Sequence, residues 1–239
     1  MKALILAAGD GDRLRCHTGG RPKPLIRILG IPLIVRTILS AKEAGIGEFV
    51  IVIGYKGEEI RAYLGDGSNL GVDIEYVFNP EWLMENGISA LAAKENLRKE
   101  GAFLLLMADH ILGMGLLQRI LERGVQDGCV LCVDRNMGSI YDLDDATKVK
   151  TLDGRIVAIG KDIEEYDAVD CGVFLCTPML FGALEDAISG GDDSLTAGIA
   201  ILARQGKMGV VDISGSPWMD IDTEPELKMA DGMLLQPVK

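Results

Sequence analysis

Short apolar runs alternate with amphipathic segments along most of the chain. Seven runs have the length and continuous hydrophobicity of buried strands. They cover residues 3–8, 49–53, 74–78, 103–107, 129–133, 173–176 and 210–213. Between most of them, apolar residues recur three and four positions apart, which is the spacing of an amphipathic helix. These helical segments are residues 33–44, 58–64, 89–99, 116–123, 179–188 and 195–204. Strands that alternate with helices predict an α/β fold with a mostly parallel central sheet covered on both faces.

Residues 147–160, TKVKTLDGRIVAIG, interrupt this alternation. Two short strand patterns flank Asp153 and Gly154, a pair that favours a two-residue turn, so we expect a hairpin that projects from the main sheet. A last helix is expected from residues 223–226, TEPE, because they combine a capping box with a proline in the first turn. We find no internal repeat or low-complexity linker, and therefore predict one domain over residues 1–239.

Charge and cysteine content narrow the choice of partners and compartment. The 239 residues include 36 acidic and 24 basic side chains, for a formal net charge of −12, so the surface should repel nucleic acid. No apolar run is long enough to span a membrane, the start lacks the features of a signal peptide, and five cysteines lack metal-site spacing. Cys129 and Cys132 lie on a predicted strand and should face opposite sides. These features predict a cytoplasmic chain.

The opening stretch LILAAGDGDRLRCHTGGRPKPL, residues 4–25, places a glycine turn and several cations directly after a strand. Small residues let backbone N–H groups approach an anion closely. The P-loop sequence is absent, and the dinucleotide-binding pattern GxGxxG starts at Gly9 and Gly11 but lacks its third glycine, which would directly follow Arg13. A third interpretation uses the cations: Arg13 and Lys23 can hold a polyphosphate.

AAGDGDRLRCHTGGRPKPL is similar to the GxGxRL…PKPL signature of the nucleotidyltransferase family, which couples nucleoside triphosphates to sugar or alcohol phosphates. The resemblance implies a Rossmann-like three-layer sandwich of the nucleotide-diphospho-sugar transferase type. It also implies that Arg13 and Lys23 are catalytic, stabilising charge on the α-phosphate. Other nucleotide-binding positions implied near the loop are Leu6, Ala8, Gly9 and Gly11. The family usually has proline at the position of Cys16, so loop stiffness should differ.

Three aspartates are candidates for a metal site. Asp109 follows the apolar run FLLLM, at the carboxyl edge of the predicted sheet, and WMDID at residues 218–222 supplies Asp220 and Asp222. Mg²⁺ prefers one or two carboxylates together with phosphate oxygens and water. The family resemblance implies that Asp109 and one of the other two hold Mg²⁺, and the choice between Asp220 and Asp222 stays open. His110 is a candidate hydrogen-bond partner.

Residues 79–91, NPEWLMENGISAL, follow the third predicted strand and open a helix. Within the family this region reads the base, and ENGxS resembles the branch that uses CTP. Asn86, Gly87 and Ser89 are therefore expected to contact the nucleotide. The alternative is an ordinary turn at Asn86 and Gly87 with Ser89 as the helix cap.

The acceptor is suggested by four blocks: MADHI, DDATKVKTLDGRIVAIGKDI, DCGVFLC and PWMDIDT. In this order they resemble the inositol-1-phosphate cytidylyltransferases, which make CDP-inositol on the route to di-myo-inositol phosphate. The resemblance implies that Lys161 meets the acceptor phosphate and that Asp170 and Gly172 line the polyol pocket. Alternatively, Lys161 is a surface charge beside an acidic run. Some members of the group are fused to a membrane-embedded phosphotransferase, a partner we also expect here.

The implied reaction is an in-line attack of an acceptor phosphate oxygen on the α-phosphorus of CTP, with release of pyrophosphate and no covalent intermediate. Two alternatives remain. In the first, the acceptor is a sugar 1-phosphate or phosphocholine, although phosphocholine needs an aromatic cage and the few candidates are Trp82, Trp218 and Tyr166. The other alternative, from a different class, is a nucleotide-sensing subunit without catalysis.

Overall fold

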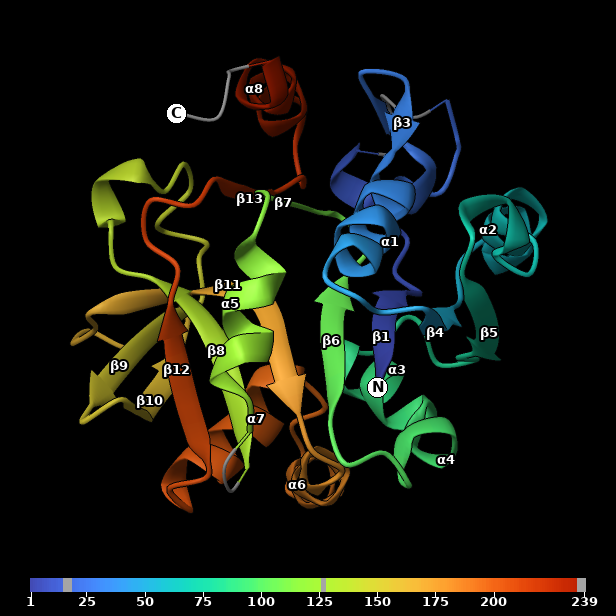
Figure 1. Cartoon of the computed structure of the whole chain (residues 1–239). Helices are drawn as coiled ribbons and strands as arrows, with labels where there is room; N and C mark the ends of the chain where they lie inside the picture. Colours follow the sequence, from blue (N-terminus) through green and yellow to red (C-terminus); the bar gives the residue numbers. More distant parts are fainter. Residues whose placement is uncertain (15–18, 126–127, 236–239) are drawn as a thin grey trace.

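The computed structural model describes residues 1–14, 19–125 and 128–235, and a nine-stranded sheet forms its centre (Figure 1). The strand order is β5-β4-β1-β6-β11-β8-β12-β10-β9. Its strands are β1 Lys2–Ala7, β4 Glu48–Ile53, β5 Asp73–Phe78, β6 Phe103–Met107, β8 Cys129–Asp134, β9 Lys148–Leu152, β10 Arg155–Gly160, β11 Ala168–Cys176 and β12 Met208–Asp212. Two small sheets pair β2 Arg27–Ile28 with β3 Ile31–Pro32, and β7 His110–Leu112 with β13 Trp218–Asp220.

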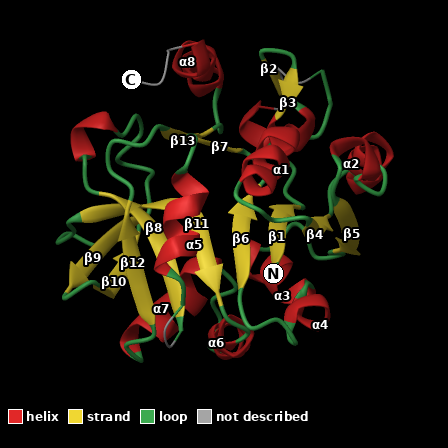
Figure 2. Cartoon of the chain, in the orientation of Figure 1, coloured by secondary structure: helices red, strands yellow, loops and turns green. Residues whose placement is uncertain are grey.

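Helices cover both faces of the sheet, as the alternating pattern predicts (Figure 2). They are α1 Leu33–Glu43, α2 Gly57–Leu64, α3 Asn86–Ala92, α4 Lys94–Leu97, α5 Leu116–Arg123, α6 Met179–Ser189, α7 Leu195–Arg204 and α8 Glu224–Leu235. Along β1, Leu4 packs in one apolar cluster with α3, α6 and α7, whereas Ile5 packs in another with α1, α2 and α5. Successive strand residues point to opposite faces, so a fully apolar strand supplies both cores.

The prediction of a mostly parallel sheet is wrong for half of the molecule. Parallel pairing joins β5, β4, β1 and β6, and also β8 and β12, but β11 runs antiparallel to β6, β8 and β9. The chain reaches β11 from β8 through a hairpin and loops without an α-helix. A parallel return needs a crossover of about a dozen residues or more, usually a helix, and no α-helix lies between β8 and β11. The α6–α7 segment then joins β11 to β12, which runs parallel to β8 and therefore opposite to β11.

The hairpin expected within residues 147–160 consists of β9 and β10, with Asp153 (φ 50°) and Gly154 (φ 74°) in the turn. Both positive φ values match the two-residue turn that the sequence predicts. The hairpin does not project freely, however. β10 pairs with β12, and β9 pairs with the start of β11, so the strands β11-β8-β12-β10-β9 close into a ring. This ring is called the acceptor-side ring below.

Most predicted elements lie within a few residues of the observed ones. The segment expected as one helix over 89–99 is divided at Ala93 into α3 and α4. α8 begins where the TEPE pattern indicates, and the Glu226 carboxylate accepts hydrogen bonds from the backbone N–H groups of Asp222 and Thr223, both at 2.6 Å. The pairing of β7 with β13 was not predicted, because strands of three residues carry no periodicity.

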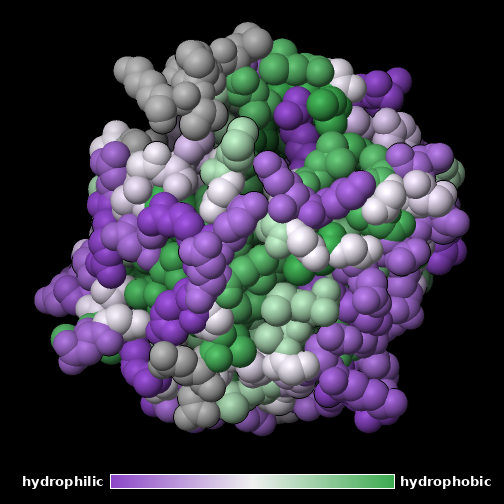
Figure 3. Space-filling view, viewed as in Figure 1, coloured by the Kyte–Doolittle hydropathy of each residue, from purple (hydrophilic) through white to green (hydrophobic). Residues whose placement is uncertain are grey.

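The described cysteines are placed as the sequence predicts. Cys129 packs in one apolar cluster and Cys132 in the other, and the four described cysteines are buried and free. Cys16 lies outside the described residues. Among the described helices, none combines the length and apolar character that a membrane span requires. Hydrophilic residues cover most of the margin of the face in Figure 3, and hydrophobic residues show near its centre.

Candidate active site

The glycine turn after β1 is anchored from both sides. Leu14 in the short 3₁₀ turn Asp12–Leu14 is fully buried in a small apolar cluster that also contains Ile221, directly before Asp222. Gly11 has φ +59°, and a Cβ placed on it would lie 2.6 Å from the Cβ of Lys23. Only glycine therefore fits here, because the position needs both a left-handed backbone and the close approach of the lysine stem.

Lys23 is a buried cation at the centre of this site. It opens the 3₁₀ turn Lys23–Leu25, stands between Pro22 and Pro24, and is only 8% exposed. Its Nζ donates to Asp109 Oδ2 at 2.6 Å and also to Asp222 Oδ1. A buried ammonium group is tolerated when it is paired in this way.

Strand pairing brings the two carboxylates together. Asp109 follows β6, and the next residue, His110, starts β7 and pairs with Asp220 on β13. The backbone N–H of Ile221 then donates to the Asp109 carbonyl at 3.1 Å. Asp222 is thereby held beside Asp109 and contacts Lys23, whereas Asp220 lies at the His110 position of the pairing.

The electrostatics of this group favour the charged forms. Burial of Asp109 opposes its ionisation, but the Lys23 ammonium and the hydrogen bond with His110 hold the pKa of this carboxyl well below its usual range. Burial likewise opposes charge on Lys23, and the two aspartates raise its pKa above the usual value. For His110, burial lowers the pKa, while the hydrogen bond with Asp109 (Nδ1 to Oδ1, 2.8 Å) outweighs it, so the net shift is upward.

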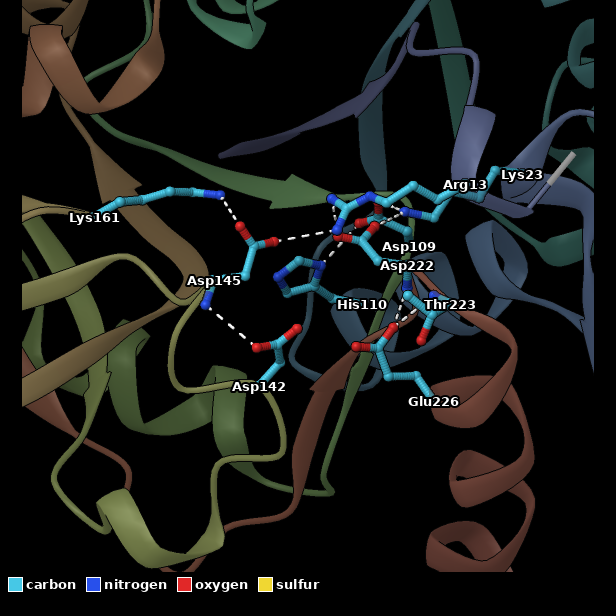
Figure 4. Close-up of polar contacts among 10 residues, drawn as sticks. All are labelled: Arg13, Lys23, Asp109, His110, Asp142, Asp145, Lys161, Asp222, Thr223 and Glu226. Carbon is cyan, nitrogen blue, oxygen red and sulfur yellow. Dashed lines mark hydrogen bonds and ion pairs between the residues drawn. The ribbon is translucent and has the colours of Figure 1, made fainter.

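A second group of charges continues from Asp222 across the site (Figure 4). Arg13 donates to Asp222 Oδ2 at 2.7 Å and to Asp145 Oδ2 at 3.2 Å. Asp145 Oδ1 in turn accepts from Lys161 Nζ at 2.5 Å. An unbroken chain of ion pairs therefore joins the glycine loop to Lys161, the residue that follows the β9–β10 hairpin. Neither Asp145 nor its contacts were expected from the sequence.

A cavity of about 440 Å³ lies at the carboxyl ends of β1 and β6. The sequence-predicted residues that line it are Leu6, Gly9, Gly11, Arg13, Lys23, Asp109 and Asp222. Other residues on its wall are Ala7, Asp10, Asp12, Pro24, Glu85 and Ala108. Ligands of open α/β folds bind at this edge of the sheet, so the cavity is the candidate active site.

The three residues expected to read the base make internal contacts. Asn86 Oδ1 accepts from the backbone N–H of Leu195 at 2.9 Å, and the buried Ser89 accepts from Asn79 at 3.0 Å. A Cβ on Gly87 would lie 2.4 Å from the Asp193 carbonyl oxygen, so this glycine packs against the start of α7. Their neighbour Glu85 lines the cavity instead.

The residues expected around the polyol gather beside His110. Gly172 has φ +68°, and a Cβ on it would lie 2.3 Å from His110 Nε2, while its N–H donates to Asp170 Oδ1 at 2.7 Å. Burial raises the pKa of Asp170 to about 6, and the charge of Asp220 adds to this, against the hydrogen bond from Gly172. Asp170 and Gly172 thus adjoin the Asp109 group from the acceptor-side ring.

Asp109 and Asp222, which both pair with Lys23, are also the candidate metal ligands. In the described part of the chain, no three or more His, Cys, Asp or Glu side chains gather into a metal-holding group. Asp109 and Asp222 nevertheless reach one shared cation from two sides. Two hard oxygen ligands with room for phosphate and water suit Mg²⁺ better than a full protein cage.

Asp145 and Glu85 are two charged residues at the site that the sequence did not predict. Asp145 is one of several acids in the segment YDLDDA at residues 141–146, and only its ion pairs with Arg13 and Lys161 distinguish it. Glu85 is likewise one exposed acid in a loop until the cavity forms around it. No spacing pattern in the sequence separates either residue from a solvated surface charge.

Known proteins are similar in sequence to nearly the whole of this chain. A "Bifunctional IPC transferase and DIPP synthase" of Rubrobacter xylanophilus is 37% identical over 238 residues, covering 98% of this chain and 52% of the relative. The chain spans about half the length of the curated relatives it matches first.

Solved structures resemble the fold over nearly the whole chain. The inositol-1-phosphate CTP transferase from T. maritima is 28% identical with a TM-score of 0.84, covering 94% of this chain and 90% of that one. A putative glucose-1-phosphate thymidylyltransferase from Bacillus anthracis has a TM-score of 0.86 at 18% identity, covering 100% and 97% of the two chains, and shows likeness of fold alone. The family described as nucleotidyl transferase matches residues 2–133, more than half of the sequence, and the chain belongs to this family.

Proposed function

We propose that this chain is a cytidylyltransferase that joins CTP and inositol 1-phosphate to give CDP-inositol and pyrophosphate. The observation that carries the proposal is the buried Lys23, held by Asp109 and Asp222 in a cavity that Arg13 also lines. The 28% identical inositol-1-phosphate CTP transferase supports the choice of substrates.

In the proposed reaction, an oxygen of the acceptor's phosphate forms a bond to the α-phosphorus of CTP. The bond from the α-phosphorus to the bridging oxygen of pyrophosphate breaks, and pyrophosphate leaves with that electron pair. The acceptor oxygen is already anionic near neutral pH, so no general base is required. Lys23 and Arg13 bind the triphosphate and stabilise charge that develops on it, and Lys161 orients the acceptor's phosphate.

Mg²⁺ fits the donor set as a cofactor of this reaction. Asp109 and Asp222 would hold it together with substrate phosphate oxygens, and it would neutralise phosphate charge when bound. We prefer Asp222 to Asp220 as the second ligand because Asp222 shares a cation with Asp109, while Asp220 faces His110 across the β7–β13 pair. His110 orients Asp109 through the hydrogen bond at its Nδ1.

The nucleotide and the acceptor are argued separately. Residues 79–91, with Asn86, Gly87 and Ser89, remain our candidate for the base-reading segment through their backbone groups and the adjoining Glu85. For the acceptor, a hydroxylated ring is favoured over phosphocholine because the three aromatic candidates have separate neighbours. Trp82 contacts Tyr55, Trp218 contacts His110 and Asp134, and Tyr166 contacts Lys148, which does not make a cage.

The product of this reaction needs a second activity to consume it. We propose that the chain works with, or is joined to, a membrane-embedded phosphotransferase that uses CDP-inositol. Support comes from the printed names of the relatives, which are bifunctional, and from the fact that this chain spans about half of them. The cytoplasmic location stays a prediction.

The test is release of pyrophosphate from CTP and Mg²⁺ in the presence of inositol 1-phosphate, compared with phosphocholine and glucose 1-phosphate. We expect turnover with inositol 1-phosphate to exceed the others at least tenfold, and CTP to exceed UTP, dTTP and ATP. No pyrophosphate with any acceptor or nucleotide would favour the nucleotide-sensing alternative.

The metal assignment is tested by two matched variants. Asp222→Asn should lower kcat about 100-fold and raise the Mg²⁺ concentration for half-maximal rate, because a carboxylate ligand is lost. Asp220→Asn removes the same charge two residues away and should keep the Mg²⁺ dependence within about threefold. Equal Mg²⁺ dependence of the two variants contradicts the choice of Asp222.

A further inference from the structure

Asp145 lies between two cations that come from opposite halves of the molecule. Its Oδ1 accepts from Lys161 Nζ at 2.5 Å and its Oδ2 from Arg13 at 3.2 Å. Figure 4 shows Lys161 and Arg13 reaching toward each other with the Asp145 carboxylate in the gap. Hydrogen bonding to Lys161 holds the pKa of Asp145 below its usual range, so the group is an anion when the site is empty of substrate.

The position of this anion matters for the reaction. The proposed function assigns Arg13 to the triphosphate and Lys161 to the acceptor's phosphate. An acceptor oxygen that attacks the α-phosphorus must lie between the groups that hold these two phosphates. The Asp145 carboxylate occupies that interval and uses the same donors that a phosphate would use.

Asp145 is also placed so that its side chain can leave without opening the core. It lies in the segment 141–146, where its N–H donates to Asp142 Oδ1 at 3.3 Å and the Ala146 N–H donates to the Asp142 carbonyl at 3.1 Å. These bonds hold the backbone, while the Asp145 side chain is 42% exposed. By contrast, the Lys23 side chain at the other end of the ion-pair chain is 9% exposed.

We propose that the Asp145 carboxylate occupies the position of the acceptor's phosphate, pairs there with Lys161 and Arg13, and moves away when that phosphate binds. Acceptor affinity then depends on how easily the phosphate displaces this carboxylate. The inference rests on the proposed function. It follows that an acceptor must offer enough negative charge to displace a carboxylate from two cations. A phosphate monoester dianion meets this requirement, and a singly charged or neutral group meets it poorly.

The decisive variant is Asp145→Asn, which keeps the shape and removes the charge. We expect KM for inositol 1-phosphate to fall at least threefold, kcat to stay within twofold, and KM for CTP to change less than KM for the acceptor. Asp144→Asn is the matched control, since Asp144 is an exposed neighbour with a side chain that forms no ion pair among the described residues. It should leave the acceptor KM within 1.5-fold, about the error of the assay. A tenfold loss of kcat in Asp145→Asn with an unchanged or raised acceptor KM overturns the proposal.

Inorganic phosphate gives a readout that does not need turnover. By calorimetry, Asp145→Asn should bind phosphate at least threefold more tightly than the parent, and this gain should vanish when Lys161→Ala is added. Asp145→Glu retains the charge and should show no gain. Unchanged or weaker phosphate binding in Asp145→Asn overturns the inference. Tighter phosphate binding in a protein that releases no pyrophosphate with any acceptor supports the phosphate position while rejecting the proposed function.

Discussion

The two halves of the sheet organise their polar residues in different ways. In the parallel half, formed by β5, β4, β1 and β6, the glycine loop follows a buried strand directly and Lys23 is almost fully enclosed. In the acceptor-side ring, Lys161 and Asp145 stand on loops at the rim and are about half exposed. The family match covers residues 2–133 and therefore ends near the end of β8, before most of this ring.

This difference suggests a division of labour. A buried, preorganised cation such as Lys23 suits the step that every member of such a family shares, because preorganised charge lowers the barrier without reorganisation. Half-exposed charges on loops suit recognition of an acceptor that differs between relatives, since loops tolerate change. Substitutions in the parallel half should mainly lower kcat, and those in the ring should mainly alter acceptor KM.

The largest expected effect is that of Lys23→Ala. Loss of an ammonium that stabilises transition-state charge should lower kcat about 100-fold to 1000-fold, with a much smaller change in CTP affinity. Steady-state kinetics and CTP titration measure the two quantities. Lys94→Ala, which removes a partly buried lysine of α4 that pairs with Glu185 of α6, is the control and should be nearly silent. A kcat within threefold of the parent would show that Lys23 has no such role.

A smaller effect of a different kind is expected for Lys161→Ala. A charge-assisted hydrogen bond to a phosphate contributes about 1.5–3 kcal/mol, so acceptor KM should rise about tenfold or more while CTP affinity stays nearly constant. Lys150→Ala removes another hairpin lysine, paired loosely with Glu165 at 4.0 Å, and should not change KM. If both variants behave alike, Lys161 is the surface charge of the alternative interpretation.

The smallest effects are expected for two glycine substitutions in the acceptor-side ring, which distinguish backbone strain from steric crowding. In Gly172→Ala the new Cβ would lie 2.3 Å from His110 Nε2. In Gly154→Ala, at a similar positive φ, the new Cβ would lie in open space. We expect Gly154→Ala to cost about 1 kcal/mol in unfolding free energy with unchanged kinetics. Gly172→Ala should cost about 1 kcal/mol more and also lower turnover several-fold, because His110 orients Asp109. Denaturant unfolding and steady-state kinetics on both variants give the comparison. Equal unfolding free energies and equal turnover in the two variants would show that His110 does not contribute to the reaction.

Much of the fold can be predicted from the sequence because the patterns that indicate it are local. The continuous apolar runs at 103–107 and 129–133 and the helix pattern at 116–123 needed no distant contact to be recognised. The Asp153-Gly154 turn and the cap at residues 223–226 follow from backbone chemistry within four residues. The same holds for the glycine loop, where neighbouring residue types predict an anion site.

Only the tertiary structure decided how the ring closes and which charges meet. Arg13 and Asp145 are 132 positions apart, and Arg13 and Asp222 are 209 apart, so no local pattern links them. The antiparallel course of β11, the contact of Lys23 with Asp222 and the bridge at Asp145 all depend on strand pairings between distant segments. A sequence states propensities over a few residues, whereas the meeting of distant side chains is set by the packing of the whole sheet.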